Sequence, residues 1–312
     1  MNRPTISRRP RALVAAVSLA TLLSAVVGCS SSGSGSAASP SSSAGAAIQA
    51  DPALAAMLPQ SVKDKGYLDV ASEIYPPAVI VAQQGAEPTG WDVETVRAIA
   101  ATLGLKARFQ IVPFDGIVPG LQAGRYQAAA GEIFITPERS AVVTFVKNHV
   151  TTDSLLVKKD RDISGATEDA LCGLTVSVQL GSAEAKFADS IAAKCQSGGK
   201  AVMQVKTFQE QAAVNLAVSE GRADAALGST SQIAYVVNQT KGKFKTVELP
   251  WGPTNATGIA LARNADTDRL AKAIEAATNK LLQDGTIKKI LDSYTGGLGA
   301  VDKAAIVPAP AS

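Results

Sequence analysis

The 312-residue sequence has a single histidine, His149, and aromatic residues make up only 4% of it. One histidine rules out a zinc site built from several histidines and argues against a Ser-His-Asp triad or a Cys-His pair. We expect His149 to lie on the surface or to serve in packing, a lone catalytic role being the alternative. Phosphate loops of the GxxxxGK[ST] or GxGxxG type are also missing. The sequence therefore predicts a protein that is not an enzyme and that uses no cofactor and no metal.

The first 28 residues predict export. Four arginines precede an uncharged apolar run from Ala12 to Val27. A basic start, a short apolar core and a small residue at the cut are typical of a secretory signal peptide. The sequence Val26-Val27-Gly28-Cys29 resembles a bacterial lipobox, whose cysteine is acylated and becomes the mature N-terminus. We expect a lipid anchor on Cys29 at the outer face of the cell membrane; the alternative is an ordinary signal peptide cut elsewhere.

Residues 30–48 are almost wholly Ser, Gly, Ala and Pro. Such a segment has too little apolar surface to form a core and is expected to act as a flexible tether. Without the four arginines of the signal peptide, the chain has 26 basic and 27 acidic residues. This near-neutral balance gives no indication of nucleic-acid binding.

Two cysteines remain once Cys29 is assigned to a lipid, namely Cys172 and Cys195. In an oxidising compartment two cysteines most simply pair. A disulfide closing a loop of this length would stabilise the fold by roughly 3 kcal/mol in the chain-entropy model. The alternative is a pair of buried free thiols.

From about residue 64 onward, apolar β-branched runs alternate with segments of helical periodicity, and the rhythm restarts after about residue 153. This alternation predicts two doubly wound α/β lobes, with chain crossings near residues 152 and 255 that act as a double hinge. In open α/β sheets, ligands lie beyond the carboxyl ends of the strands. The expected segments are a signal peptide at 1–28, a lipidated flexible tether at 29–60, the first part of lobe 1 at 61–152, lobe 2 at 153–255, a return to lobe 1 at 256–296, and a loose tail at 297–312.

Four stretches at the expected cleft loops resemble the family 3 extracellular solute-binding proteins, which serve ABC transporters for polar amino acids. They are Tyr75-Pro76-Pro77, Gly90-Trp91-Asp92-Val93-Glu94, Phe114-Asp115-Gly116-Ile117-Val118-Pro119-Gly120-Leu121 and Ile135-Thr136-Pro137-Glu138-Arg139, with Gly221-Arg222-Ala223-Asp224-Ala225 as a weaker fifth. The resemblance spans residues 64–296. It implies a type II periplasmic-binding-protein fold, which agrees with the lobes expected from the residue pattern.

The resemblance also implies roles for four residues. Arg139, in the opening turn of a helix, matches the clamp on the ligand's carboxylate; the alternative is an exposed arginine paired with Glu138 or Asp115. Tyr75 and Phe114 match an aromatic pair that encloses the ligand, with ordinary core packing as the alternative. Ser182 matches a donor to the ligand carboxylate, and the alternative is a simple helix N-cap.

The chain also departs from the usual amino-acid binders. Phe134 stands where they have Thr or Ser, and Ser229 stands where they have the Asp that holds the α-ammonium. This combination is similar to the ectoine-binding branch and favours a zwitterion whose cation is not the usual α-ammonium. Glu132 is a candidate replacement for the missing acid, although it might equally pair with Arg139 or face solvent.

The sequence therefore predicts a monomeric binding protein. It would capture a small zwitterion, such as an amino acid or an ectoine- or betaine-like solute, and deliver it to the permease of an ABC importer. Two alternatives remain on the same fold. One is an exported cyclohexadienyl-type dehydratase, with Glu132 as an acid beside Arg139, and the other is a receptor module that senses ligand for a membrane partner.

Overall fold

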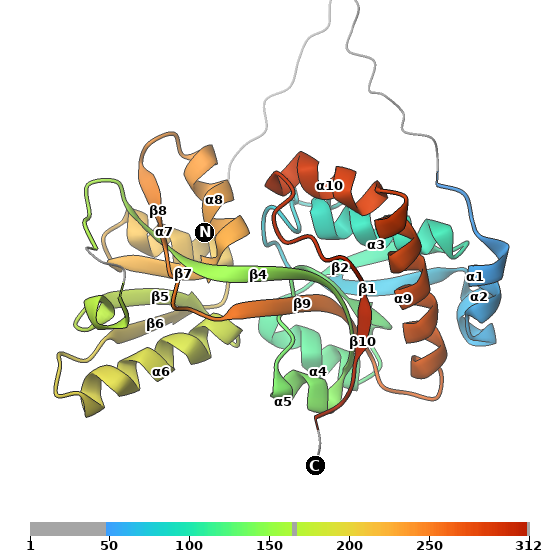
Figure 1. The fold of residues 1–312 in the computed structure, drawn as a ribbon, viewed down its shortest axis with the longest axis horizontal. Coiled ribbons are helices and arrows are strands. Elements are labelled where there is room, and N and C mark those ends of the chain that lie inside the picture. Colours follow the sequence, from blue (N-terminus) through green and yellow to red (C-terminus); the bar gives the residue numbers. More distant parts are fainter. Residues whose placement is uncertain (1–47, 164–166, 311–312) are drawn as a thin grey trace, which may run out of the picture. The chain divides into compact units, whose positions relative to one another are not determined.

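The computed structural model describes residues 48–163 and 167–310, which form two α/β lobes joined by two strands (Figure 1). The expected signal peptide, Cys29 and the tether up to residue 47 lie outside the described residues. Among the helices of the described ranges, none is both long and apolar enough to cross a membrane.

Lobe 1 comprises residues 48–152 and 254–310. Its elements are α1 (Pro52–Met57), α2 (Gln60–Lys65), β1 (Tyr67–Ser72), α3 (Trp91–Thr102), β2 (Lys106–Ile111), the 3₁₀ turn η1 (Phe114–Gly116), α4 (Ile117–Gln122), β3 (Ala128–Ala129), α5 (Pro137–Val142), the first part of β4 (Thr144–Lys158), β9 (Thr254–Leu261), α9 (Thr267–Gln283), α10 (Thr286–Thr295) and β10 (Ala305–Val307).

Lobe 2 comprises the described residues between 153 and 253. Its elements are the second part of β4, the 3₁₀ turn η2 (Glu168–Leu171), β5 (Thr175–Gln179), α6 (Ala183–Ser197), β6 (Gln204–Phe208), α7 (Gln211–Ser219), β7 (Ala225–Ser229), α8 (Thr230–Gln239) and β8 (Phe244–Glu248).

The two lobes repeat one strand arrangement. In lobe 1 the parallel strands run in the order β2-β1-β3, and in lobe 2 they run in the order β6-β5-β7. Antiparallel strands complete each sheet, with β9, β4 and β10 in lobe 1 and β4 and β8 in lobe 2. The predicted pair of α/β lobes with a double crossing is thereby confirmed.

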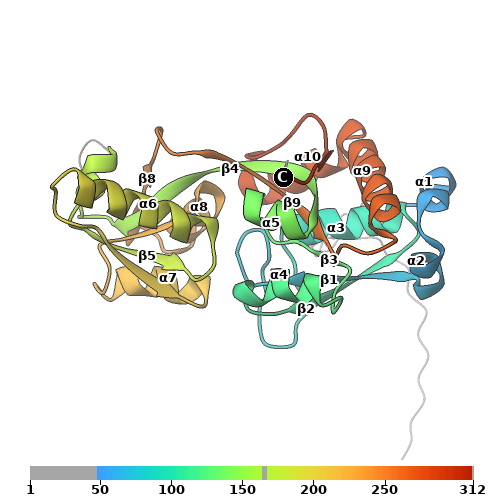
Figure 2. The same cartoon turned by 90° about the horizontal axis from the view of Figure 1, so that it is seen from below.

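Helices cover both faces of each sheet because successive strand residues point to opposite sides. On β1, Val70 packs with α3 and α9 in one core, whereas Ala71 packs with α4 in another. On β4, Leu155 faces the core under α6 and Leu156 faces the core under α7. Figure 2 shows the two helix layers of lobe 2, with α6 and α7 on opposite sides of β5.

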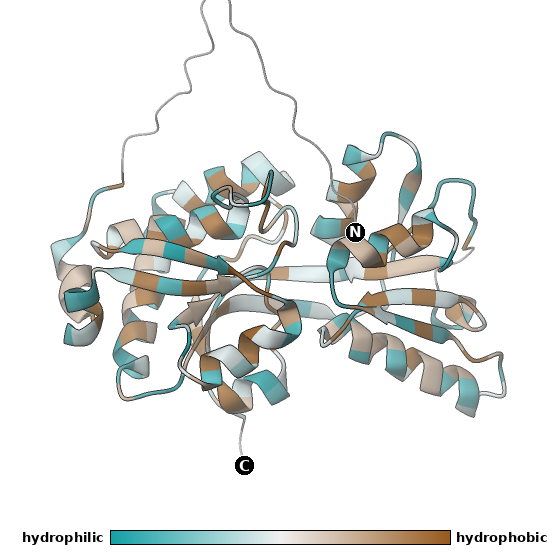
Figure 3. Cartoon of the chain, turned by 180° about the vertical axis from the view of Figure 1, so that it is seen from behind, coloured by the Kyte–Doolittle hydropathy of each residue, from teal (hydrophilic) through white to brown (hydrophobic). Residues whose placement is uncertain are grey.

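The helices carry the apolar stripes that this packing requires. On α9 the buried residues include Leu270, Ile274, Ala277 and Leu281, which follow helical spacing. Figure 3 shows the result along the helices, where hydrophobic residues alternate with hydrophilic ones, while the central strands are mostly apolar. The stripe fixes which face of each helix meets the sheet, and thereby where its N-terminus lies.

Strand β4 belongs to both lobes and changes partner in mid-course. Thr152 is paired with Thr254 of β9, and the next residue, Asp153, is paired with Ser229 of β7. The first crossing between the lobes is therefore regular strand, whereas the second passes from the turn at residues 249–253 into β9.

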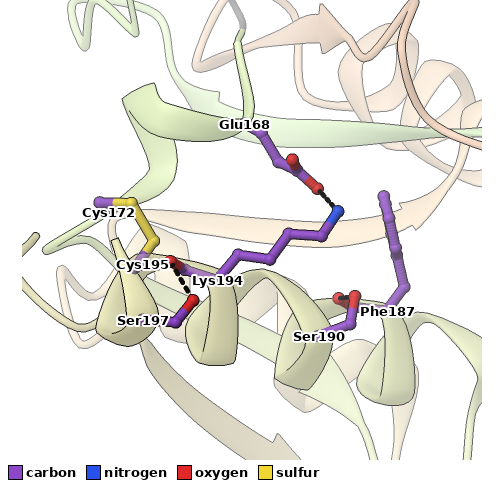
Figure 4. Close-up of polar contacts among 7 residues, drawn as sticks. All are labelled: Glu168, Cys172, Phe187, Ser190, Lys194, Cys195 and Ser197. Atoms are coloured by element: carbon purple, nitrogen blue, oxygen red, sulfur yellow. Dashed lines mark hydrogen bonds and ion pairs between the residues drawn. A yellow bond between two sulfur atoms is a disulfide. The ribbon is translucent and has the colours of Figure 1, made fainter. Parts of the chain in front are cut away.

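The predicted disulfide between Cys172 and Cys195 is confirmed, with a Cα–Cα distance of 5.6 Å. It joins the end of η2 to the last turn of α6 in lobe 2 (Figure 4). The residue before Cys195, Lys194 of α6, forms an ion pair with Glu168 of η2 at 2.5 Å. These two links attach the loop before β5 to the outer helix, on the side away from the cleft loops.

The structure differs from the sequence analysis at both ends of the body. The tether was expected to reach residue 60, but α1 begins at Pro52 with Asp51 as its N-cap, and Leu58 is buried in the core of lobe 1. The tail was expected to be loose, but β10 pairs with β4, and Ala304 is buried. In both places the order comes from partners far away in the sequence, which local periodicity does not reveal.

His149 has a packing role, as expected. Its ring stacks on Trp91 with centroids 4.2 Å apart, and burial lowers its pKa to about 4. Gly299 crosses directly over the ring, where a Cβ would lie 1.7 Å from Nε2. The C-terminal segment therefore holds His149 in place at the back of β4.

Candidate functional site

The carboxyl ends of the parallel strands of both lobes meet at one cleft, and the loops that follow them supply its side chains. Tyr75 follows β1, Phe114 follows β2 and Glu132 follows β3. From lobe 2, Ser182 follows β5 and Ser229 ends β7. The strand order brings these loops together, as expected for ligand sites in open α/β sheets.

Tyr75 is a bridge between the lobes. Its backbone pairs with Val79 in lobe 1, which holds the loop closed on itself. Its hydroxyl donates to Ser229 Oγ and accepts from the Ser229 backbone N–H, both at 3.2 Å. The structure therefore brings Tyr75 and Ser229 together as buried neighbours, and a role for the ring in enclosing a ligand stays a prediction.

Arg139 lies in the first turn of α5, whose N-cap is Thr136. Nη1 donates to the Phe134 carbonyl at 2.8 Å, and Nη2 donates across the cleft to the Gly181 carbonyl at 3.0 Å. The guanidinium lies 5.0 Å from the centroid of the Phe114 ring. Burial lowers the pKa of Arg139, while the charges of nearby carboxyl groups act in the opposite direction.

The alternative for Arg139, an ion pair with Glu138 or Asp115, is not what the geometry shows. Glu138 pairs instead with Lys186 of lobe 2 at 3.1 Å, and no ion pair within the described ranges includes Arg139. The Arg139 guanidinium instead donates to two neutral backbone carbonyls, and a carboxylate would be a stronger acceptor than either.

The position of Phe134 gives less information about its role. It is buried, and its backbone forms an isolated bridge to Thr257 of β9. Its carbonyl oxygen accepts a hydrogen bond from Arg139, and within the described residues the ring forms no aromatic or cation–π contact with the cleft. A role for this ring in enclosing the solute stays a prediction.

Glu132 reaches across the cleft to lobe 2. Ser231 Oγ lies 3.0 Å from both of its carboxylate oxygens and donates to them. The residue has φ 57°, an uncommon left-handed conformation, and its N–H donates to the buried Asp92 carboxylate at 2.9 Å. Burial raises the pKa of Glu132 to about 8. Glu132 is therefore neither in solvent nor paired with Arg139, and its role as a partner for the ligand's cation stays a prediction.

Ser182 and Ser229 are both helix N-caps. Ser182 Oγ accepts from the Ala185 N–H at 3.0 Å at the start of α6. Ser229 Oγ accepts from the Gln232 N–H at 3.3 Å at the start of α8. Two helix N-termini therefore face the cleft, and each presents backbone N–H groups and a positive dipole end.

Sequence reasoning missed three acids of the cleft. Glu73 follows β1 and accepts from Gln179 of lobe 2 at 2.5 Å; burial raises its pKa to about 8. Asp153 lies on β4 at the crossing, and Glu184 lies in the first turn of α6; burial raises the pKa of both carboxyls. The available signal for Glu73 and Glu184 was their position next to predicted cleft loops, and for Asp153 its position at the predicted chain crossing.

A cavity of about 280 Å³ opens at the mouth of the cleft next to Arg139. Its lining comes from both lobes and includes Phe114, Asp115, Arg139, Gly181, Ser182 and Lys186. The donors of Arg139 and of the α6 N-terminus therefore border one hollow space. Groups of three or more His, Cys, Asp or Glu side chains able to hold a metal do not occur in the described parts of the chain.

Comparison with known proteins gives three kinds of match. The model of the bacterial extracellular solute-binding proteins, family 3, matches residues 68–297. The arginine-binding protein ArgT of Corynebacterium glutamicum is 26% identical over 261 residues, which cover 83% of this chain and 84% of that protein. A solved ancestral arginine-binding protein bound to glutamine is 29% identical, with a TM-score of 0.66, over 74% of this chain and 98% of that one.

A third protein is similar in fold. The crystal structure of EhuB in complex with hydroxyectoine matches with a TM-score of 0.66 and 20% identity, over 75% of this chain and 90% of that one. At this level of identity the likeness extends to the fold alone.

Proposed function

Because this chain belongs to the bacterial extracellular solute-binding proteins of family 3, we propose that it captures an amino acid or related zwitterion between its lobes and delivers it to the permease of an ABC importer. The observation that carries this proposal is the position of Arg139. A half-buried guanidinium that forms no ion pair with the described residues, set over Phe114 at a helix N-terminus, is suited to a carboxylate.

The contacts between the lobes support capture by closure. Tyr75–Ser229, Glu132–Ser231 and Arg139–Gly181 all join a lobe 1 residue to a lobe 2 residue. These groups must separate to admit a solute, and they close around it again by rotation about the two crossings. The proposal gives the monomer a binding role and the cleft no catalytic role.

Binding is tested by a thermal-shift and calorimetry panel of amino acids, betaines and ectoines, with glucose as an uncharged control. A ligand present at 100 times its Kd stabilises the folded protein by about 2.7 kcal/mol, which corresponds to a rise of about 5 °C in Tm. We expect at least one zwitterion to give such a shift and glucose to give none. The absence of binding by every zwitterion in the panel would contradict the proposal. In a separate assay, aromatisation of prephenate by the protein would favour the dehydratase alternative instead.

The anchor is part of the same proposal and concerns Cys29. Its lipobox-like sequence supports acylation of the cysteine, and two or more acyl chains hold a protein firmly to a membrane. Cells fed an alkyne-bearing fatty acid are expected to label the wild-type protein and not a Cys29→Ala variant, which should appear in the medium. Labelling of both proteins would show that the lipid is attached elsewhere, and labelling of neither would show that the protein has no such anchor.

A further inference from the structure

The cleft contains far more acid than base. Four carboxyl side chains lie buried where the two lobes meet: Glu73 is 6% exposed, Glu132 4%, Asp153 2% and Glu184 7%. The cation that acts on Glu73 and Glu184 is Arg139. Lys186, at the rim, is already paired with Glu138. If all four acids are ionised, the group including Arg139 has a formal charge of −3.

The Asp153 carboxyl points to the cleft side of the lobe 2 sheet. It is directly opposite Ser229 in the β4–β7 pair, and directly opposed residues point to the same face of a sheet. That face is the cleft, because the Ser229 hydroxyl meets Tyr75 of the other lobe there. Asp153 Oδ2 accepts from Asn255 at 3.2 Å, whereas Oδ1 is buried and has no hydrogen-bond partner. A buried oxygen left in this way is costly unless a donor arrives to meet it.

Glu132 is held in position by its backbone. The Asp92 carboxylate accepts from the N–H groups of Gly131 and Glu132 at 2.7 and 2.9 Å, and this fixes the left-handed turn. A non-glycine residue in that conformation is strained, and such strain persists where surrounding structure enforces it. The Ser231 and Ser229 side chains serve this carboxylate, which can accept about four hydrogen bonds. Capacity for a further donor therefore remains at this carboxylate.

Glu184 lies between these groups and Arg139. Its charge acts on Glu73, Tyr75, Glu132, Arg139 and Asp153, which places it centrally among the cleft side chains. A neutral zwitterion would leave the excess of negative charge around it unchanged. A solute with a net positive charge would reduce this excess of negative charge. Because the acids are buried, the resulting difference in binding free energy between a cationic and a neutral solute is large.

We infer that the cleft selects solutes with a net positive charge, which carry one carboxylate for Arg139 and at least two cationic groups for the surrounding acids. This inference rests on the proposed function and narrows it to amino acids with a basic side chain and molecules of the same charge pattern. It departs from the neutral, ectoine-like zwitterion that Phe134 and Ser229 suggest in the sequence. Glu132 and Asp153 supply, beside Ser229, the acid that the sequence lacks at position 229.

The test uses ligands that differ in charge and little else. L-Arginine and L-citrulline have nearly the same shape, but the guanidinium of one is a neutral urea in the other. L-Lysine and Nε-acetyl-L-lysine form a second pair, and agmatine is arginine without its carboxylate. Calorimetry at pH 8 is expected to show arginine or lysine binding at least tenfold more tightly than its neutral counterpart, and agmatine binding at least tenfold more weakly than arginine.

The outcomes separate this inference from the proposed function. Citrulline, glutamine or ectoine binding as tightly as the cationic ligands would overturn the inference and leave solute capture intact. Agmatine binding as tightly as arginine would overturn the assignment of a carboxylate to Arg139. If no ligand in either panel binds, both the inference and the proposed function fail.

A matched pair of variants tests the acid directly. Glu132→Gln removes one cleft charge and keeps the shape, whereas Asp189→Asn removes one charge from an exposed position on α6. Glu132→Gln is expected to lower the ratio of arginine to citrulline affinity at least fivefold, and Asp189→Asn is expected to leave the ratio unchanged. A merely structural role for Glu132 would weaken both ligands equally, so an unchanged ratio in Glu132→Gln contradicts the inference.

Discussion

Replacing Arg139 with alanine is expected to weaken binding of any carboxylate-bearing solute by about 2–5 kcal/mol, or roughly 30- to 4,000-fold in Kd. The variant removes the guanidinium that lies over Phe114 and leaves the solute's carboxylate buried without a charged partner. It also removes the hydrogen bond to Gly181 that joins the lobes. Titration calorimetry of the wild type and the variant with the same ligand measures the loss.

Two further variants make this result specific. Arg222→Ala removes an exposed arginine that pairs with Glu220 in lobe 2, away from the cleft, and is expected to bind as the wild type does. Arg139→Lys keeps the charge but not the planar two-pronged donor, so an intermediate Kd is expected. A Kd for Arg139→Ala within twofold of the wild-type value would show that the carboxylate is held elsewhere.

The ligand-free protein is expected to open as the pH rises from 5 to 9. Burial in the closed cleft raises the pKa values of Glu73 and Glu132 to about 8, whereas in the open form these groups regain water and titrate near 4.5. The closed form therefore binds more protons between about pH 4.5 and 8. Its stability relative to the open form falls through that window by about 1.4 kcal/mol per pH unit for each such carboxyl.

The charges that face these two groups set the direction of the effect. Glu184, Arg139 and Asp115 act on Glu73, and Glu184 and Asp92 act on Glu132. Only Arg139 opposes the mutual repulsion of the ionised acids. Small-angle X-ray scattering should show a radius of gyration that increases with pH, and a Glu73→Gln, Glu132→Gln double variant should show a flatter profile. A wild-type radius that stays constant or decreases over this range would refute the expectation.

Much of the fold was predictable because it follows from local patterns. The spacing of apolar residues along α9 and the apolar strand runs indicated helices and strands, and their alternation indicated parallel sheets. At the ends, the outcome depended on distant partners. Asp51-Pro52 is a sound helix start, but the Ala- and Ser-rich segment before it masked the boundary. β10 has three residues and is ordered through its pairing with β4.

The site was predictable where a residue's position in a motif defines its role. Tyr75, Arg139, Ser182 and Ser229 lie on the cleft loops that the sequence indicated. Glu73, Asp153 and Glu184 are single acids on three different elements, and no spacing in the sequence links them. Only the folding of both lobes, followed by closure, brings them near one another and buries them. Their shared electrostatics is therefore a property of tertiary structure.

Strand β4 makes the geometry of opening unequal along the cleft. In the proposed opening, the unbroken strand from Thr152 to Asp153 lies close to the axis about which the lobes rotate. Asp153, next to this axis, would move little, whereas the Glu138–Lys186 pair at the rim would move far. A solute gripped near Asp153 thus acts with a short lever arm. The same attraction exerted at Arg139 and beyond applies a larger closing torque, so the outer end of the solute does most to hold the lobes shut.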